Sequence, residues 1–429
     1  MKIPKQKIVA LLAIIFISGY SAHAQSARDT VKISLAEAEK TFLQNNFSLL
    51  AAKYNIDVNR SLIRQAKLWD NPILSTDQNV FDKQGGFFKH DNNNGQFYVQ
   101  VMQLIKTAGK RSKAAQLATD NTTLSQEQFD DILRSLRYTL RNDLLEVNHL
   151  LKIKKVYDGE IAEVNKLVAG MDLQLQAGNT SVKDNLRIKA LLFSLQNELV
   201  NVDAQLIPVE SEIRLLLNNA ENKFIAPKLA YKFGELTTSI MPAAEDLLKQ
   251  AETNRPEIRM AKTQLQFQQH NLVYQKAMAK PDLSIGTEFD QHSSYAPNYV
   301  GLAISLPLNI LNRNQGNIAA SKFAVQEQNV LTNQTTSRIR NDITVAVDKV
   351  KFYQNVNNLQ QLGFSQQYDT LFTNMLKSYQ ERQMSLLEFI DFMDAYKDNK
   401  LKLIEQHNGL IHAIEDLNYA VNAIVITLD

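Results

Sequence analysis

One pattern occurs twice in the chain at a fixed offset, and it limits the fold more than any other feature. In each copy, a helical pattern stops before a proline and a segment of alternating apolar residues begins; the copies cover residues 45–75 and 254–284. Proline disfavours helix in the residue before it and cannot continue one, so each copy predicts a helix, a stop and a strand. The period is too long for a solenoid repeat, and the chain is therefore predicted to be a duplicated half-protein. The matching positions are Asn45 and Asn254, Ala52 and Ala261, Lys53 and Lys262, Pro72 and Pro281, Leu74 and Leu283, and Ser75 and Ser284.

The duplication predicts two structural repeats joined by a link. The first repeat covers residues 25–218, with a hairpin at about 72–106. The second covers residues 242–429, with a hairpin at about 281–308. Turn residues break the helical pattern at 219–241, which we interpret as the inter-repeat link.

Residues 1–24 have the features of a secretory signal peptide. Three lysines precede an apolar run over 8–17, and Ala22-His23-Ala24 supplies small residues for cleavage after Ala24. A membrane anchor helix would need about 20 apolar residues, so this run is too short to be one. The mature chain is predicted to leave the cytoplasm, and any membrane role must then use strands because no other long apolar run follows.

The composition excludes several functions. Glycine (14) and proline (9) are scarce in 429 residues, which favours long helices. The net charge of +2 does not favour a nucleic-acid partner. The absence of cysteine excludes disulfides, thiolate metal sites, cysteine nucleophiles and a lipid anchor on an N-terminal cysteine.

Two proline-free stretches predict very long helices, at about 112–176 and 314–377. At 1.5 Å per residue, each would be about 100 Å long. Each ends in a turn, and a returning helix follows at 182–218 and at about 386–427.

The returning helices are too short to match the long ones alone. A helix precedes each hairpin; the first opens with a capping pattern at Ser34 and Glu37 and continues to about Trp69. Stacked end to end with such a helix, a returning helix again spans about 100 Å. The stripes of alanine and leucine predict packing like that of a coiled coil, with polar outer faces.

The hairpins alternate in hydrophobicity. Residues 96–105, 283–289 and 300–306 place apolar side chains on one face, and in the second hairpin small or polar ones line the other. This pattern is typical of a barrel wall between lipid and lumen, although each segment alone fits a soluble hairpin equally well. A polar loop over 82–95 carries two phenylalanines and is assigned no role.

No motif predicts enzymatic chemistry. The segment 107–112 resembles a phosphate-binding loop, but the glycine required five residues before Gly109 is Leu104. His407 and His412 are five residues apart and do not share a helix face. The sequence therefore predicts no catalytic residues, no metal ligands and no cofactor.

Acidic residues recur every three positions after the turn that ends the second long helix, at Glu388, Asp391 and Asp394. On an isolated helix this is most often a solvated face. In a tube of several subunits each position would form a ring of like charges that can bind cations. The first half offers Asp184 and Arg187 at the positions of Glu388 and Asp391.

These features together resemble the outer membrane efflux family, whose best-known member is TolC. The resemblance covers essentially the whole mature chain. It is carried by the breaks at Pro72 and Pro281, the turn at 108–111, and the tip sequences 178–184 and 379–391. The segments 69–72 and 107–111 resemble the metal-efflux branch of the family, the CusC and CzcC type.

The resemblance implies a mainly α fold with a transmembrane β-barrel portion. Each chain would contribute four strands to a trimeric twelve-stranded barrel, and a long antiparallel helical tunnel would lie in the periplasm, with the link in the equatorial region. The function implied is a passive exit duct of a tripartite efflux system, which exports metal cations or drugs across the outer membrane of a Gram-negative bacterium. The implied partners are two further copies, outer membrane lipid, a periplasmic adaptor and an inner-membrane pump of the RND type.

The resemblance also implies functional residues at the two helical tips. A periplasmic aperture is expected at Glu388, Asp391, Tyr379, Arg382 and Asp184. The chain departs from the family pattern with Glu388 at the first acidic position and with Arg382 where glycine is usual. The tip residues expected to contact the adaptor are Gly178, Asn179, Thr180, Ser181, Gln383, Met384 and Ser385.

The alternative is a soluble periplasmic coiled-coil adaptor. Adaptors also contain long helical hairpins, but they carry one hairpin between all-β domains rather than two copies of helix, strand, strand and helix. An adaptor would also dissolve without detergent, whereas a channel would sediment with outer membranes.

Overall fold

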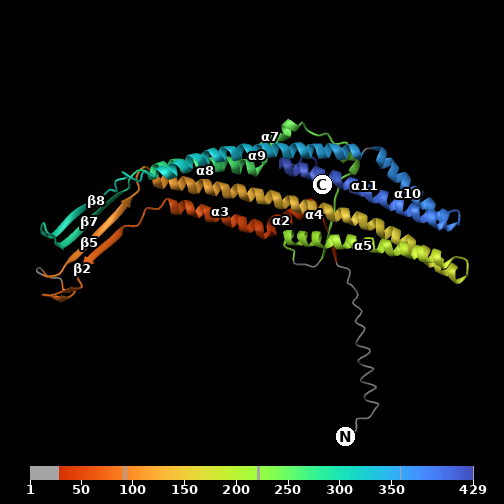
Figure 1. Ribbon diagram of the computed structural model, residues 1–429, viewed down its shortest axis with the longest axis horizontal. Coiled ribbons are helices and arrows are strands. Elements are labelled where there is room, and N and C mark those ends of the chain that lie inside the picture. The colour runs from red at the N-terminus through yellow and green to blue at the C-terminus, as the bar shows by residue number, and fades with distance from the viewer. Residues whose placement is uncertain (1–28, 90, 92–93, 220–222, 358, 429) are drawn as a thin grey trace, which may run out of the picture.

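The computed structural model describes residues 29–89, 91, 94–219, 223–357 and 359–428, so the expected signal peptide at 1–24 lies outside the described residues. The molecule is a long arc with a β-sheet at one end and two helical hairpins at the other (Figure 1). None of the described helices is long and apolar enough to span a membrane.

A four-stranded antiparallel sheet forms the first end of the arc. Its order is β2 (Ile73–Gln78), β5 (Phe97–Ile105), β7 (Leu283–His292) and β8 (Pro297–Ser305). The two predicted hairpins are therefore confirmed, and they join through the central pair of β5 and β7, in register from Tyr98 opposite Asp290 to Ile105 opposite Leu283. Within the described chain, β2 and β8 each pair on one side only.

The polar loop of the first hairpin contains a small hairpin of its own. β3 (Phe81–Asp82) pairs antiparallel with β4 (Gly86–Phe87). The rings of Phe81 and Phe87 lie 5.1 Å apart. This local structure was not predicted from the sequence.

The first long helix is confirmed as α4 (Lys110–Gln176), with 67 residues. The second expected long helix, 314–377, is wrong as one element because it divides into α9 (Gln315–Val356) and α10 (Leu359–Gln380). The amide of Asn357 explains the division: its Nδ2 donates to the carbonyl oxygens of Tyr353 (2.8 Å) and Gln406 (3.1 Å). A side-chain amide that binds backbone carbonyls competes with the helical pattern, and α10 turns away from the axis of α9 (Figure 1).

The helix expected from Ser34 to about Trp69 is also divided, into α2 (Leu35–Asn45) and α3 (Phe47–Ala66). Asn46 between them is extended, and its Oδ1 accepts from the Leu49 amide at 3.1 Å, so it caps α3. The second half breaks at the matching position, Arg255, between α7 (Ala244–Asn254) and α8 (Pro256–Met278).

The returning helices are α5 (Val182–Leu217) and α11 (Leu386–Val421). The expectation of a helix to about 427 is wrong, because α11 ends at Asn422 in the left-handed conformation. Figure 1 shows α5 continuing the line of α3 and α2. The junction is held by the Asn46 side chain, whose Nδ2 donates to the Leu216 carbonyl at 3.0 Å.

The middle segment adds two elements that were not predicted individually. β6 (Phe224–Pro227) pairs in parallel with the N-terminal strand β1 (Thr30–Ile33), and α6 (Phe233–Thr237) follows. The parallel pairing joins segments almost 200 residues apart.

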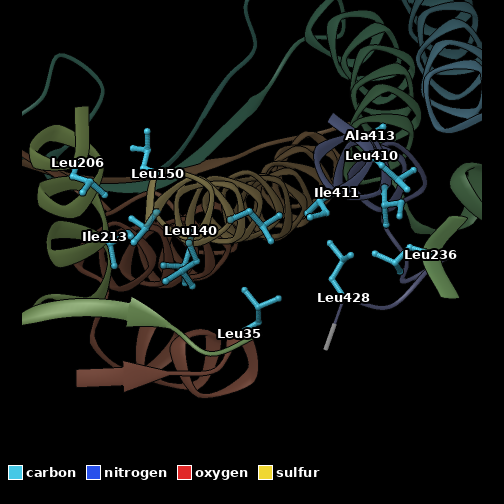
Figure 2. Close-up of a cluster of buried hydrophobic side chains, with 14 of the residues drawn as sticks. Leu35, Leu140, Leu150, Leu206, Ile213, Leu236, Leu410, Ile411, Ala413 and Leu428 are labelled. Carbon is cyan, nitrogen blue, oxygen red and sulfur yellow. The ribbon is translucent and has the colours of Figure 1, made fainter. Parts of the chain in front are cut away.

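Part of the apolar core lies where these middle elements meet the helices. Figure 2 shows Leu35 of α2, Leu140 of α4 and Ile213 of α5 close together, with Leu410 and Ile411 of α11 nearby. All five are at most 2% exposed. The core therefore holds the middle of the arc together, between the sheet and the tips.

A charged network surrounds this core. Arg134 contacts Glu257 at 2.7 Å, and Arg255 contacts the same carboxylate. Arg141 bridges Glu39 and Glu415, each at 2.8 Å. These ion pairs connect α4 to α8, α2 and α11, so they help to fix the relative positions of these helices.

Glu160 on α4 is a buried acid without a hydrogen bond. It is 3% exposed and neither carboxylate oxygen has a partner among the described residues. Burial, opposed chiefly by Lys397, raises the pKa of Glu160 to about 8. The other charged groups that act on this carboxyl are Glu198, Asp394 and Asp398.

We expect Glu160→Gln to stabilise the protein at alkaline pH and to change it little at pH 5. The native state keeps the proton up to about pH 8 while the unfolded chain releases it above about pH 4.5, so the wild type loses stability across that window. Melting temperatures at pH 5 and 8.5 measure the effect, which should be several degrees at the higher pH. Glu163→Gln, which removes an acid paired with Lys166, is the control without this gain. An equal shift at both pH values would contradict the assignment.

Candidate aperture at the helical tips

The two helical tips are built from the same backbone pattern. At the first, the Asn179 amide donates to the Gln174 carbonyl (2.8 Å) and the Gly178 amide to that of Leu175 (3.0 Å). At the second, the amides of Gln383 and Arg382 donate to the carbonyls of Ser378 (2.9 Å) and Tyr379 (3.0 Å). Both are Schellman closures, in which the residue after the cap adopts the left-handed conformation.

The left-handed residue is Gly178 in the first tip and Arg382 in the second, with φ of 72° and 61°. A residue with a Cβ pays about 1 kcal/mol or more for this conformation. Arg382 therefore keeps the geometry of a glycine turn, and its exposed side chain adds a positive charge at the end of the molecule.

A serine caps the helix that follows each turn. Ser385 Oγ and N both donate to Glu388 Oε2, at 2.7 and 2.9 Å, and Glu388 N donates back to Ser385 Oγ at 3.3 Å. Ser181 and Asp184 repeat the arrangement, with Ser181 Oγ donating to Asp184 Oδ2 at 2.7 Å and Asp184 N donating to Ser181 Oγ at 3.0 Å.

The cap also holds the charge of Glu388. The Ser385 amide and then its hydroxyl lower the pKa of the Glu388 carboxyl, which keeps it ionised. Glu388 thus has a capping role that was missed at this position, although the same spacing of serine and glutamate was recognised at Ser34 and Glu37.

Tyr379 connects the two tips. Its ring stacks on Phe389 with centroids 4.5 Å apart, and its hydroxyl donates to Met171 Sδ on α4 at 3.4 Å. Burial and then the negative charge of Asp184 raise the pKa of Tyr379. The structure therefore brings Tyr379 and Asp184 near one another, from different hairpins.

The remaining expected residues lie on the tip surface. Asp391 is exposed on α11, one turn beyond Glu388. Asp394 lies 3.8 Å from Lys397, so its charge is partly compensated. Among the residues expected to contact an adaptor, Thr180 and Met384 are half-buried, and the following are exposed: Gly178, Asn179, Ser181, Gln383 and Ser385.

His407 and His412 lie along α11 and contact residues outside the tips. His407 stacks against Phe233, with centroids 3.9 Å apart, and His412 Nδ1 lies 2.9 Å from Asn142 Oδ1. In the part of the chain that the structure describes, no three histidines or carboxylates are placed to hold a metal ion.

Residues 40–219 match the sequence family described as Outer membrane efflux protein. A curated relative is the cobalt-zinc-cadmium resistance protein CzcC of Cupriavidus metallidurans, 22% identical over 319 residues, which cover 72% of this chain and 73% of the relative.

Solved structures share the fold of almost the whole chain. A CusC structure superposes with a TM-score of 0.72 at 15% identity, covering 92% of this chain and 93% of that one. The Campylobacter jejuni CmeC outer membrane channel gives 0.72 at 13% identity, with 91% and 86% covered. The open MtrE channel of Neisseria gonorrhoeae gives 0.69 at 15%, with 91% and 89% covered. The family match over residues 40–219 and the fold shared by almost the whole chain together support an outer membrane efflux channel of the TolC-like type.

Proposed function

We propose that three copies of the chain assemble into one passive exit duct. The observation that carries this proposal is the sheet, whose edge strands β2 and β8 each pair on one side only within the described chain. An unpaired edge leaves backbone groups unsatisfied in lipid, and pairing β8 of one copy with β2 of the next removes both edges. Three copies of four strands close a twelve-stranded barrel. Exposed apolar side chains on the edge strands are those of Ile73, Leu74, Val300, Leu302 and Ile304.

The helices support the same assembly. α5 exposes Leu186, Phe193, Val200 and Ile207, which recur every seven residues along one stripe. Such a seam is typical of helices that pack side by side, and a second copy is the occupant that extends the helical columns into a closed tunnel.

The duct carries out no chemistry in this proposal. An inner-membrane pump of the RND type supplies the energy, and a periplasmic adaptor contacts the tip residues named above. Adaptor binding shifts the tips from a closed to an open arrangement, because it favours one of two packings of the hairpins.

We further propose that Glu388 and Asp391 form acidic rings at the periplasmic aperture, with Tyr379, Arg382 and Asp184 holding the tips together. Six carboxylates around a threefold axis would repel one another and attract cations. Export of divalent metal cations is the favoured function, in line with the cobalt-zinc-cadmium resistance of the CzcC relative; drugs are the other class of cargo.

Planar-bilayer recordings of the purified mature protein test the aperture. We expect small, long-lived, cation-selective channels. In Glu388→Gln, Asp391→Asn and the double variant, conductance should rise and block by Zn²⁺ or Co²⁺ should weaken. Glutamine at position 388 can still accept from Ser385, so the cap remains while the charge is removed. Reversal potentials under a ZnCl₂ gradient report the permeability to the metal.

Glu245→Gln on α7 is the control, because this exposed acid pairs only loosely with Lys249 at 3.6 Å. Helix α7 lies away from the tips (Figure 1). Unchanged conductance and block in both single variants and the double would refute the acidic rings. A water-soluble monomer without conductance would refute the duct itself and favour the adaptor alternative.

A further inference from the structure

A cavity of about 420 Å³ lies where the helices meet the sheet. It is lined by the end of α3 and the connection to β2, by the connection from β5 into α4, and by the end of α8. In Figure 1 these crossovers lie at one level of the arc, where the ribbon changes from helices to strands. With the sheet in the outer membrane, this is the level of the phospholipid headgroups of the inner leaflet.

The cavity is lined by three basic and two acidic side chains, so one cation has no carboxylate partner among the lining residues. Lys106 pairs with Asp70 at 2.9 Å, and the buried Lys110 pairs with Asp282 at 2.7 Å. Asp282 Oδ1 also accepts from the Thr107 amide at 2.8 Å. Both carboxylates are therefore already bound.

Arg111 is the third cation. Within the described residues it forms no salt bridge, and its guanidinium lies over the ring of Trp69, 3.8 Å from the centroid. Stacking leaves the N–H groups at the rim of the guanidinium free to donate in the plane. A planar donor of this kind matches the paired oxygens of a phosphate.

The start of α4 adds to the positive field. Its N-cap is Gly109, which supplies no side-chain cap, and its first turn contains no acidic residue. Lysine and arginine at the positive end of a helix are unfavourable unless an anion lies nearby. Here the cavity, the stacked Arg111 and the helix end all favour the same kind of ligand.

The aromatic residues of the cavity indicate where this ligand comes from. Trp69 is 60% exposed, and Tyr274 of α8 lines the cavity. Tryptophan and tyrosine are enriched where hydrocarbon meets the headgroups. Four residues after Trp69, β2 begins with Ile73 and Leu74, both exposed and apolar, as expected for contact with acyl chains.

We propose that this cavity binds the phosphate of a phospholipid headgroup in the inner leaflet, with Arg111 as the main donor. Lys106 and Lys110 add charge from their ion pairs, and Trp69 packs against the glycerol and upper acyl region. The proposal rests on the placement of the sheet in the membrane, which the proposed function also uses. It adds a lipid to a channel otherwise described by its cargo and protein partners.

Native mass spectrometry of the detergent-purified protein tests the proposal. The probes are dioleoyl-phosphatidylglycerol, dioleoylglycerol, which lacks the phosphate, and inorganic phosphate. We expect the wild type to retain phosphatidylglycerol and to bind the other two far more weakly. Arg111→Gln should weaken phosphatidylglycerol binding by about tenfold or more, and Arg111→Lys should weaken it less.

Arg313→Gln is the matched control. Arg313 lies at the corresponding crossover from β8 to α9, is exposed, and does not line the cavity. Its replacement should leave lipid binding unchanged. A melting temperature of Arg111→Gln near that of the wild type in pure detergent excludes misfolding as the cause of lost binding.

Several outcomes would overturn the proposal. Equal binding by the wild type and Arg111→Gln would remove Arg111 as the donor. Inorganic phosphate bound as strongly as the lipid would assign the cavity to a free anion, and dioleoylglycerol bound equally would leave only apolar contact. A wild type that retains no lipid would mean that another chain covers the cavity. Because lipid is counted per chain, failure to form a trimer or to conduct is recorded separately, by mass and by bilayer recording.

Discussion

The double variant Phe193→Glu and Val200→Glu is expected to be a monomer in detergent. Both side chains lie on the α5 stripe and are 67% and 62% exposed in the single chain. Burying each side chain against a second copy would contribute about 1.5–3 kcal/mol to the free energy of association. The same contribution would occur at each of the interfaces of the trimer. Glutamate removes the apolar contact and brings carboxylates into the seam. Light scattering after size exclusion measures the mass.

Asn201→Glu is the control for added charge on the same helix. It is exposed but lies off the stripe, so this variant should remain a trimer. The single variants should shift the mass in part or lower the concentration range over which the trimer persists. If the double variant keeps the mass of three chains, the α5 stripe does not form the interface and another face must be sought.

The second large effect is expected from Arg141→Met, which should lower the free energy of unfolding by about 3–5 kcal/mol. Arg141 and Glu415 are almost fully buried, with side chains 7% and 4% exposed. Burial raises the pKa of Glu415, and Arg141 opposes that rise. Without the guanidinium, the carboxylate either stays charged without a partner or takes up a proton, and both cost stability. Denaturant unfolding followed by helix circular dichroism measures the loss.

Adding Glu415→Gln to Arg141→Met should restore part of the lost stability, since the unpaired charge is then gone. Lys349→Met is the control for a pair to the same helix. Its partner Asp416 follows Glu415, but the Lys349 side chain is 53% exposed, and such pairs contribute about 1 kcal/mol or less. Similar losses of unfolding free energy in Arg141→Met and Lys349→Met would mean that burial does not increase the contribution of the Arg141 ion pair to stability.

Local signals were sufficient for much of the fold. The prolines at 72 and 281 end helical patterns and begin strands, and this agrees with the observed elements within a few residues. The serine and glutamate at 34 and 37 form the capping box that their spacing predicts. The glycine turn at 178 closes α4 as expected, because left-handed backbone is accessible to glycine at little cost.

At the candidate site, residue spacing located the tips but did not assign every role. The spacing of Ser385 and Glu388 carries the same capping signal as that of Ser34 and Glu37, in addition to the solvated face or acidic ring that the three-residue spacing of the acids predicts. The contact of Tyr379 with Met171 could not be predicted, because it joins residues of different hairpins. Whether the acids line an aperture depends on the threefold assembly, which is tested by the experiments above.

The sequence alone determined the types of element, the two hairpins and the closure of both tips, because each depends on residues close to one another in the chain. It also determined the duplication, because the two copies can be compared directly as sequence. Tertiary structure decided the breaks at Asn46 and Asn357, where a side-chain amide binds a carbonyl of a distant helix. It also decided the parallel pair of β1 and β6 and the register of β5 on β7. The physical reason is that a broken helix or a paired strand is stable only when its partner, many residues away, supplies the hydrogen bond that the local chain lacks.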